Sequence, residues 1–250
     1  MRKFFLTVAY KGTAYHGWQK QPNAVSVQEK IETSLSTLLQ TETAILGSGR
    51  TDTGVHATAQ VFQLELPNDI DISQIVYRLN KLLPHDIAVS DYKEVNEDTH
   101  ARFDAVSRSY EYHINTKKNA FTQDLSYYFT HSLDVPLMNE AAESMKAFTD
   151  FESFSKVKTD VNTFNCEIFE AIWKPHNELL VFHVSANRFL RGMVRTIVGT
   201  LLEVGLHNLT VEGFKNIIES KDRKAAGRSV PAHGLFLTSV KYPQKIYKAD

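Results

Sequence analysis

Chemistry-bearing side chains are concentrated in residues 47–56 of this 250-residue sequence, which read Gly-Ser-Gly-Arg-Thr-Asp-Thr-Gly-Val-His. The carboxylate of Asp52, the guanidinium of Arg50 and the imidazole of His56 lie here among three glycines. Glycine adopts positive φ and lets a ligand approach closely, so such a turn can display Asp52 into a cleft. The commoner role of an Asp-Thr-Gly turn is to satisfy local amides. No Gly-Lys-Ser/Thr follows, so the segment lacks the spacing of a phosphate-binding loop.

A nucleophilic carboxylate needs a cation nearby, because it must stay ionised in a partly dry site. Arg50 and Arg195 are the candidates. The apolar spacing of residues 189–204 predicts an amphipathic helix, and Arg188, Arg191 and Arg195 fall three and four residues apart on its other face. We therefore expect the three arginines to point the same way, although the solvated side of an ordinary helix has the same pattern.

Apolar periodicity, capping residues and breakers predict the elements that must position these residues. Strands are expected at residues 4–10, 57–66, 87–95, 109–115, 168–174, 179–185 and 235–241. Helices are expected after the capping box of Ser26 and Glu29 and at residues 73–83, 137–148, 189–204 and 211–220. The alternation of the second strand breaks near Phe62, where we expect a bulge. Gly199 would let another segment pack closely on the helix that carries Arg195.

The order of the elements favours an α+β fold. Strands and helices cluster rather than alternate strictly, which indicates mainly antiparallel sheets instead of a doubly wound parallel sheet. No long Gly/Ser/Pro linker interrupts the chain, so we expect two tightly joined halves, residues 1–105 and 106–250. The first half carries the Asp52 loop and the second carries Arg195.

Composition restricts the class of protein. The sequence is 42% hydrophobic and 23% charged, as in ordinary soluble proteins. The apolar stretch at residues 4–10 is too short for a signal peptide or a membrane span, so we expect a cytoplasmic protein with no membrane partner. Cys166 is the single cysteine, which excludes an intrachain disulfide and a Cys-rich zinc or iron–sulfur site. The ten histidines are scattered without a His-Glu-x-x-His pattern, and no metal site is expected.

The formal net charge of −1 conceals a segregation of charge along the chain. Residues 1–20 hold four basic and no acidic residues, and residues 186–228 hold eight basic and four acidic residues. Residues 134–170 instead hold eight acidic and three basic residues. This distribution suits a protein that presents one basic surface to a polyanion, and it equally fits solvated faces without function.

Five ordered blocks of the sequence resemble one enzyme family. GRTDTGVHA (residues 49–57) closely matches the signature of the TruA-type tRNA pseudouridine synthases. The blocks AYKGTAYHGWQKQP (9–22), HARFDAVSRSYEYHI (100–114), FLRGMVRTIVGTLLEVG (189–205) and VPAHGLFLTSVKYP (230–243) are similar to the family in order and spacing. The resemblance thus extends from the first expected strand to the last.

The resemblance implies a role for each candidate residue. Asp52 is the nucleophile, Arg50 belongs to the same catalytic loop, and Arg195 is the basic partner of Asp52. Tyr110 is the aromatic residue that packs on the target base, and Leu190 is part of the apolar wall. Isomerising uridine breaks the bond from N1 to the ribose and joins C5 instead, with no net redox change, so no cofactor is expected. Whether Asp52 attacks C1′ of the ribose or C6 of the base stays open.

The resemblance also implies a substrate and an assembly. The family acts on the tRNA anticodon stem-loop at positions 38 to 40 and works as a homodimer in which both subunits touch one tRNA. Its fold has two similar α/β-sandwich halves, with a basic cleft between their sheets. From charge and position we expect the phosphate contacts to be Arg2, Lys11, Lys20, His56, Arg188 and Arg191.

Two short segments depart from the family pattern. Asn165, Cys166 and Glu167 stand where an arginine is often found, and Arg191 and Gly192 occupy places commonly taken by an aromatic residue and a histidine. Neither departure touches the expected catalytic residues.

Three other classes of protein are weighed against the synthase. A catalytically silent tRNA-binding protein of the same fold would keep Tyr110 and the basic stripe but could lose Asp52. A glycosidase or nucleosidase would need a second carboxylate as acid or base; no convincing partner stands near Asp52 in sequence, and a distant carboxylate could still converge on it in the fold. A metal hydrolase would need a spacing of ligands that the histidines lack.

Overall fold

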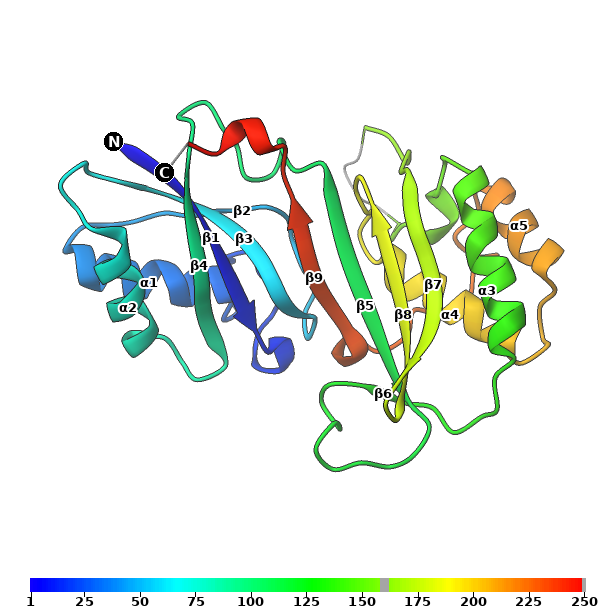
Figure 1. The fold of residues 1–250 in the computed structure, drawn as a ribbon. Helices are drawn as coiled ribbons and strands as arrows, with labels where there is room; N and C mark the ends of the chain where they lie inside the picture. The colour runs from blue at the N-terminus through cyan, green and yellow to red at the C-terminus, as the bar shows by residue number, and fades with distance from the viewer. Residues whose placement is uncertain (158–161, 249–250) are drawn as a thin grey trace. The chain divides into compact units, whose positions relative to one another are not determined.

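The computed structural model describes residues 1–157 and 162–248, which form two compact units (Figure 1). The first unit is Met1–Val106 together with the chain from Leu237 onward, and the second is Ser107–Phe236. The expected division at residue 105 assigned the C-terminal segment to the second half, whereas it belongs to the first unit. No helix among the described residues is both long and apolar enough to cross a membrane.

The first unit is built on an antiparallel sheet. Its strand order is β4-β1-β3-β9, and a short β2 pairs with β3. The strands are β1 (Arg2–Tyr10), β2 (Leu46–Gly47), β3 (His56–Leu66), β4 (Ile87–Val95) and β9 (Leu235–Lys241), of which the part from Leu237 belongs here. The helices are α1 (Val27–Leu39) and α2 (Ile72–Leu82), with short 3-10 turns at Gly12–Ala14 and Gln244–Ile246. The two helices pack on each other, and α2 also packs on β4.

Capping and breaking residues set the bounds of α1 and α2. The Ser26 side chain accepts the Glu29 N–H and the Glu29 side chain accepts the Ser26 N–H, which confirms the predicted capping box. The Asp71 side chain caps α2 by accepting the Ser73 N–H, and the helix ends just before Pro84.

The bulge expected near Phe62 is wrong. Phe62 stays in register with Leu6, and the register of β1 against β3 shifts farther along, where Val8 faces Gln60 and Tyr10 faces Ala57. The apolar alternation breaks at Phe62 for another reason, since both faces of β3 are covered there. Phe62 is buried, and the neighbouring Val61 packs in a separate cluster on the opposite face.

The C-terminal segment joins the first unit by covering that opposite face. Ile246 is buried in one cluster with Phe5, Val61, Val95 and Ala101. This burial of apolar surface explains why the chain returns to the first unit after residue 236.

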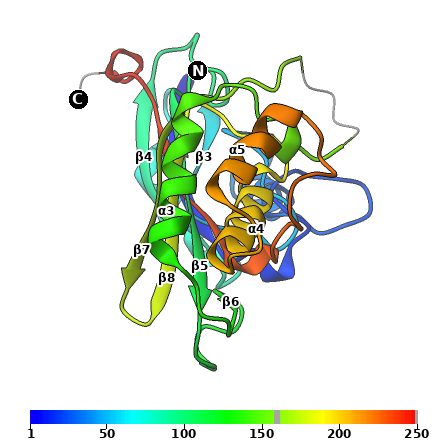
Figure 2. The same cartoon turned by 90° about the vertical axis from the view of Figure 1, so that its right-hand side faces the viewer.

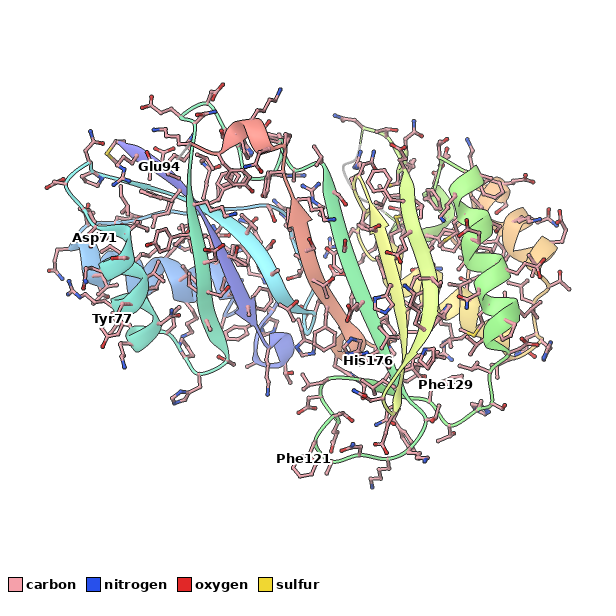
Figure 3. The ribbon with its side chains drawn as sticks, in the orientation of Figure 1. Asp71, Tyr77, Glu94, Phe121, Phe129 and His176 are labelled. Atoms are coloured by element: carbon pink, nitrogen blue, oxygen red, sulfur yellow. The ribbon has the colours of Figure 1, made fainter. Side chains whose placement is uncertain are left out.

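Glu94 adds an electrostatic contact to the same segment (Figure 3). The Arg2 Nε atom lies 2.9 Å from Glu94 Oε2, and the Lys248 Nζ atom lies 2.9 Å from Glu94 Oε1. Hydrogen bonds from Arg2 and then Lys248 hold the pKa of Glu94 below its usual value.

The second unit packs three helices on antiparallel strands of order β5-β8-β7. Its strands are β5 (Ser107–Asn115), β7 (Ile168–His176), β8 (Leu179–Ala186) and the short β6 (Tyr127–Tyr128), which pairs in parallel with the end of β5. Its helices are α3 (Val135–Ser144), α4 (Met193–Gly205) and α5 (Val211–Ser220), with 3-10 turns at Met145–Ala147, Glu152–Phe154 and Ala232–Gly234. Figure 2 shows α3, α4 and α5 together on one side of these strands. Mixed elements with mostly antiparallel pairing confirm the expected α+β class.

The helix expected at residues 189–204 begins later than predicted. Gly192 has a φ of 74° in the left-handed region, so α4 starts only at Met193. Arg188 and Arg191 therefore precede the helix, and the prediction that they share a helix face with Arg195 is wrong.

The close approach expected at Gly199 is confirmed. A Cβ on this residue would lie 1.8 Å from the carbonyl oxygen of Arg228, so only glycine lets that backbone pack on α4.

The helix expected at residues 137–148 is shifted toward the N-terminus. Asp134 caps α3 by accepting the Leu137 N–H at 3.0 Å, and Pro136 occupies the first turn, where a missing N–H costs no hydrogen bond. The α-helix ends at Ser144 and continues as a single 3-10 turn.

Candidate active site

The loop that carries Asp52 is tied at its start to β3. The Ser48 N–H donates to the Val61 carbonyl at 2.7 Å, and the Ser48 hydroxyl donates to Gln60 Oε1 at 2.6 Å. The amide nitrogen of the Gln60 side chain donates to the Gly49 carbonyl at 2.9 Å. Gln60 is fully buried, so its side chain gives the loop a fixed internal support.

Residues 10–18 hold the centre of the same loop. The hydroxyls of Tyr10 and Thr51 lie 2.8 Å apart, and the Trp18 N–H donates to the Thr51 carbonyl at 3.3 Å. The Gly54 N–H donates to the Tyr15 carbonyl, also at 3.3 Å. The loop after β1 therefore positions the candidate nucleophile, a role that the sequence pattern did not indicate.

Glycine is required where these two loops touch. Gly17 has a φ of 88°, and a Cβ there would lie 2.3 Å from the carbonyl oxygen of Thr51. A Cβ on Gly12 would lie 2.0 Å from the carbonyl oxygen of Val55. Spacing alone did not reveal these two contacts, because the partner residues lie more than thirty positions away in the sequence.

Asp52 lies in the turn that these contacts hold. The Val55 N–H donates to the main-chain carbonyl of Asp52 at 3.1 Å, and Gly54 has a φ of 78°. Asp52 is partly exposed, between the buried Thr51 and the exposed Thr53, and Val55 is buried again. The turn thus places the carboxylate at the surface, between two buried residues that anchor it.

Arg50 and His56 flank this turn in different ways. Arg50 is exposed, and its Nε atom donates to Gln19 Oε1 at 3.1 Å. His56 is 1% exposed, and its Nδ1 atom accepts the Gly12 N–H at 3.0 Å. Because a ring buried in this way holds the glycine loop, we reassign His56 from a phosphate contact to a positioning residue.

The basic residues expected from the N-terminal region lie in separate places. Arg2 pairs with Glu94 at the end of β1 opposite to Tyr10, a separation of about 26 Å along nine residues of strand. Lys11 is exposed directly after Tyr10. Lys20 is half-exposed, with its Nζ atom 3.1 Å from Glu32 Oε2. Of these three cations, Lys11 follows the strand end that contacts the Asp52 loop, and Arg2 is far from it.

Tyr110 lies in the middle of β5, opposite Val184 of β8. Its ring meets the Phe189 ring edge-on, with centroids 5.1 Å apart and an interplanar angle of 87°. Tyr110 is partly exposed, so part of its surface remains available to a ligand. Phe189 was not among the predicted site residues, although it opens one of the family-like blocks.

Arg195 projects from the first turn of α4 and is fixed by backbone contacts. Its Nε atom donates to the Val230 carbonyl at 2.7 Å, and its own carbonyl accepts the Val230 N–H at 3.2 Å. The buried Tyr112 hydroxyl donates to the next carbonyl, that of Pro231, at 2.9 Å. Burial raises the pKa of Tyr112, and the positive charge of Arg195 acts in the opposite direction. The Val230 backbone thus orients the guanidinium.

Leu190, Arg188 and Arg191 precede α4 in this unit. Leu190 is buried, as a member of an apolar wall would be. Arg188 is partly buried and Arg191 is exposed, and the Arg191 carbonyl accepts the Lys156 N–H at 2.9 Å. The three residues lie on a loop, so their order along the chain does not give them a common face.

The segment that departs from the family pattern makes structural contacts. Burial raises the pKa of the Cys166 thiol to about 11, and the Cys166 N–H donates to the Thr149 carbonyl. The Glu167 N–H donates to Asn187 Oδ1 at 2.9 Å. Residues 158–161, which precede this segment, lie outside the described residues. Because its side chain is buried, Cys166 packs inside this segment as a small apolar residue.

Comparison with known proteins gives one consistent result. A family model described as tRNA pseudouridine synthase matches residues 6–104 and 141–243. The chain is 47% identical to tRNA pseudouridine synthase A of Parabacteroides distasonis, with 100% of both chains covered. It is 47% identical to the enzyme of that name from Bacteroides thetaiotaomicron, covering 100% of this chain and 94% of the relative. It is 39% identical to the Bacillus subtilis protein of that name, covering 94% and 97%.

Proposed function

This chain belongs to the tRNA pseudouridine synthase family, and from that premise we propose that it converts uridine to pseudouridine in tRNA with Asp52 as the nucleophile. The observation that carries the proposal is the full-length identity to relatives of that name, together with the rigidly held turn that presents the Asp52 carboxylate. The first unit then supplies the catalytic loop, and the second supplies Tyr110 and Arg195.

The proposed reaction rearranges bonds within one nucleotide. The bond from N1 to C1′ breaks, the uracil rotates, C5 bonds to C1′, the proton on C5 is released, and N1 takes up a proton from solvent, so the product is an isomer of the substrate. The Asp52 carboxylate assists by forming a transient covalent bond with C1′ or C6. No electrons are gained or lost overall, so we propose that the reaction needs no cofactor.

Arg195 is proposed as the basic partner of Asp52. The bond from its Nε atom to the Val230 carbonyl fixes the direction of the guanidinium, and a fixed cation stabilises a carboxylate better than a mobile one. Arg50, on the same loop as Asp52, is proposed to act on the nucleotide that carries the target base.

Tritium release from tRNA labelled at uridine C5 tests the function directly. The wild-type protein is expected to release tritium, because the C5 proton leaves when the new glycosidic bond forms. If the protein binds tRNA but releases no tritium from any uridine-containing tRNA, it is a silent binding protein and the proposal is wrong.

We propose that the Tyr110 ring packs on the uracil once it has left the helical stack. Replacing Tyr110 with leucine should then lower turnover about tenfold to a hundredfold, the range expected for loss of one base–aromatic stack. Binding of tRNA should change less than threefold, because the ring acts after the base is extruded. Single-turnover rates and filter-binding affinities measure the two effects separately.

Tyr110→Phe is the matched control, since it keeps the ring against Phe189 and should retain most of the turnover. An equal loss of binding and turnover in Tyr110→Leu would contradict the stacking role.

We further propose a target site and an assembly from the family resemblance. The target is the anticodon stem-loop at positions 38 to 40, and the active form is a cytoplasmic homodimer in which both subunits contact one tRNA. The basic residues Lys11, Lys20, Arg188 and Arg191 are proposed to contact its phosphates. Primer-extension mapping of pseudouridine checks the positions, and sedimentation of the purified protein checks the dimer. Modification elsewhere, or a monomeric active enzyme, would contradict these two proposals.

A further inference from the structure

The loop between β5 and β6 carries an unusually exposed aromatic side chain. Phe121 is 92% exposed, more than any other large hydrophobic side chain in the described parts of the chain. Figure 3 shows it on the outer side of this loop, pointing away from the strands. The loop, residues 116–126, lies outside the two segments that the family model matches.

Side-chain hydrogen bonds hold the backbone on both sides of Phe121. The Asn115 side chain is 3% exposed, accepts the Lys117 N–H at 3.0 Å and donates to the Thr122 hydroxyl at 3.0 Å. The Asn119 carboxamide oxygen accepts the Phe121 N–H at 2.9 Å. The loop is therefore bound to the end of β5 both before and after its exposed ring.

The return of the loop to the sheet is equally well anchored. The buried Ser126 hydroxyl donates to the Thr122 carbonyl at 2.9 Å, and the Phe129 N–H donates to the Asn115 carbonyl at 2.9 Å. Beyond Ser126 the chain pairs with β5 as β6. Phe121 is thus exposed in a defined loop conformation. Because the loop backbone is already held, binding through this ring costs little conformational entropy.

The charges beside the ring favour an anionic partner. Lys117 and Lys118 are both exposed, and Asp124 is the single acidic residue of the loop. A flat aromatic surface beside two cations is complementary to a nucleotide, which offers a planar base and a negative phosphate. A base within a duplex already stacks on its neighbours, so the partner must be an unpaired nucleotide.

We propose that Phe121 stacks on an unpaired base of the tRNA substrate while Lys117 and Lys118 contact the adjoining phosphates. The identity of the RNA rests on the proposed function. The contact is separate from the target uridine, because Tyr110 lies five residues before the buried anchor Asn115, about 17 Å along β5. It adds affinity and specificity for folded tRNA and takes no part in the chemistry.

Binding of unmodified tRNA transcript to the full-length protein tests this contact. Phe121→Ala should weaken binding about tenfold, and Phe121→Tyr should bind within twofold of wild type because it keeps the ring. Turnover at saturating tRNA should be the same in all three proteins, so the loss appears in KM and not in kcat. Phe169→Ala is the matched control, since Phe169 is also exposed in this unit but lies on β7, and its affinity should equal that of wild type.

The lysines are tested through the salt dependence of the same binding. Replacing Lys117 and Lys118 together with alanine should reduce the slope of log affinity against log salt by about 1.4, or about 0.7 for each phosphate contact on a single strand. An unchanged slope would show that neither lysine contacts a phosphate and would overturn that part of the proposal.

Three further results would overturn the stacking contact. In the first, Phe121→Ala binds tRNA within twofold of wild type. In the second, Phe121→Tyr fails to restore tRNA binding. In the third, Phe121→Ala dissociates a protein assembly and leaves the affinity for tRNA unchanged. Because tRNA binding does not require turnover, the experiments can reject the stacking contact and the enzymatic function independently of each other. A protein that releases no tritium but needs Phe121 for tRNA binding would keep this inference and reject the enzymatic one.

Discussion

Asp52→Asn is expected to reduce tritium release from uridine-labelled tRNA by about 10⁴-fold or more. Loss of a catalytic nucleophile lowers the rate of other enzymes by a similar factor. Asparagine has nearly the same size as aspartate, but its neutral amide cannot attack carbon at a useful rate. The turn is held by main-chain bonds of Thr51, Gly54 and Val55, which the substitution leaves in place. The variant should therefore fold and bind tRNA with nearly wild-type affinity.

Asp69→Asn is the matched control for this experiment. It makes the same change of charge at an exposed position of the same unit, in the loop between β3 and α2, and should keep full activity. Asp52→Ala extends the test by removing the side chain beyond Cβ. Full tritium release by either Asp52 variant would show that another group is the nucleophile.

The second large effect is expected from Gly17→Ala, which alters the support of the catalytic loop and leaves its chemistry in place. The new Cβ would lie 2.3 Å from the Thr51 carbonyl, and an L-residue at a φ of 88° is strained by about 1–2 kcal/mol in addition. The loop must move to relieve the contact, and displacement of a catalytic group by about 1 Å can cost a hundredfold in rate. We expect kcat to fall about tenfold to a hundredfold, with a melting temperature lowered by several degrees, measured by tritium release and calorimetry.

Gly49→Ala makes the same chemical change within the Asp52 loop and serves as its control. No atom lies within 4 Å of a Cβ built on Gly49, so this variant should keep wild-type stability and nearly wild-type kcat. If Gly17→Ala were as active as Gly49→Ala, the loop after β1 would not position Asp52.

Local signals predicted the elements of the fold closely. The capping box of Ser26 and Glu29 begins α1, and Pro84 follows the end of α2, because both signals depend on residues within one helical turn. The start of α4 was misplaced because residues 189–192 continue the apolar pattern of a helix, whereas Gly192 adopts a left-handed conformation. The return of the chain after residue 236 depends on burial against Phe5 and Val61, which no local pattern reports.

The sequence drew attention to the charged candidates of the site and not to the residues that support them. Asp52 and Arg50 stood out because glycines and charges are rare together in one short segment. His56 was misjudged, since the pattern reveals an imidazole but not that its Nδ1 atom accepts a buried amide. The supports act through backbone contacts of Gly12, Gly17 and the Val230 carbonyl. Such contacts join segments that are distant in the sequence, and no pattern of side-chain types indicates them.

The contribution of the last residues to the first unit has a consequence for biosynthesis. The second unit is one uninterrupted stretch, Ser107–Phe236, whereas the first lacks Ile246 and the part of β9 from Leu237 until that stretch has been synthesised. Translation proceeds at about 5–20 residues per second, so the segment that covers Phe5, Val61 and Val95 is synthesised on the order of ten seconds after them. The unit whose synthesis begins first is therefore completed after the second unit, and its apolar face stays uncovered during this interval.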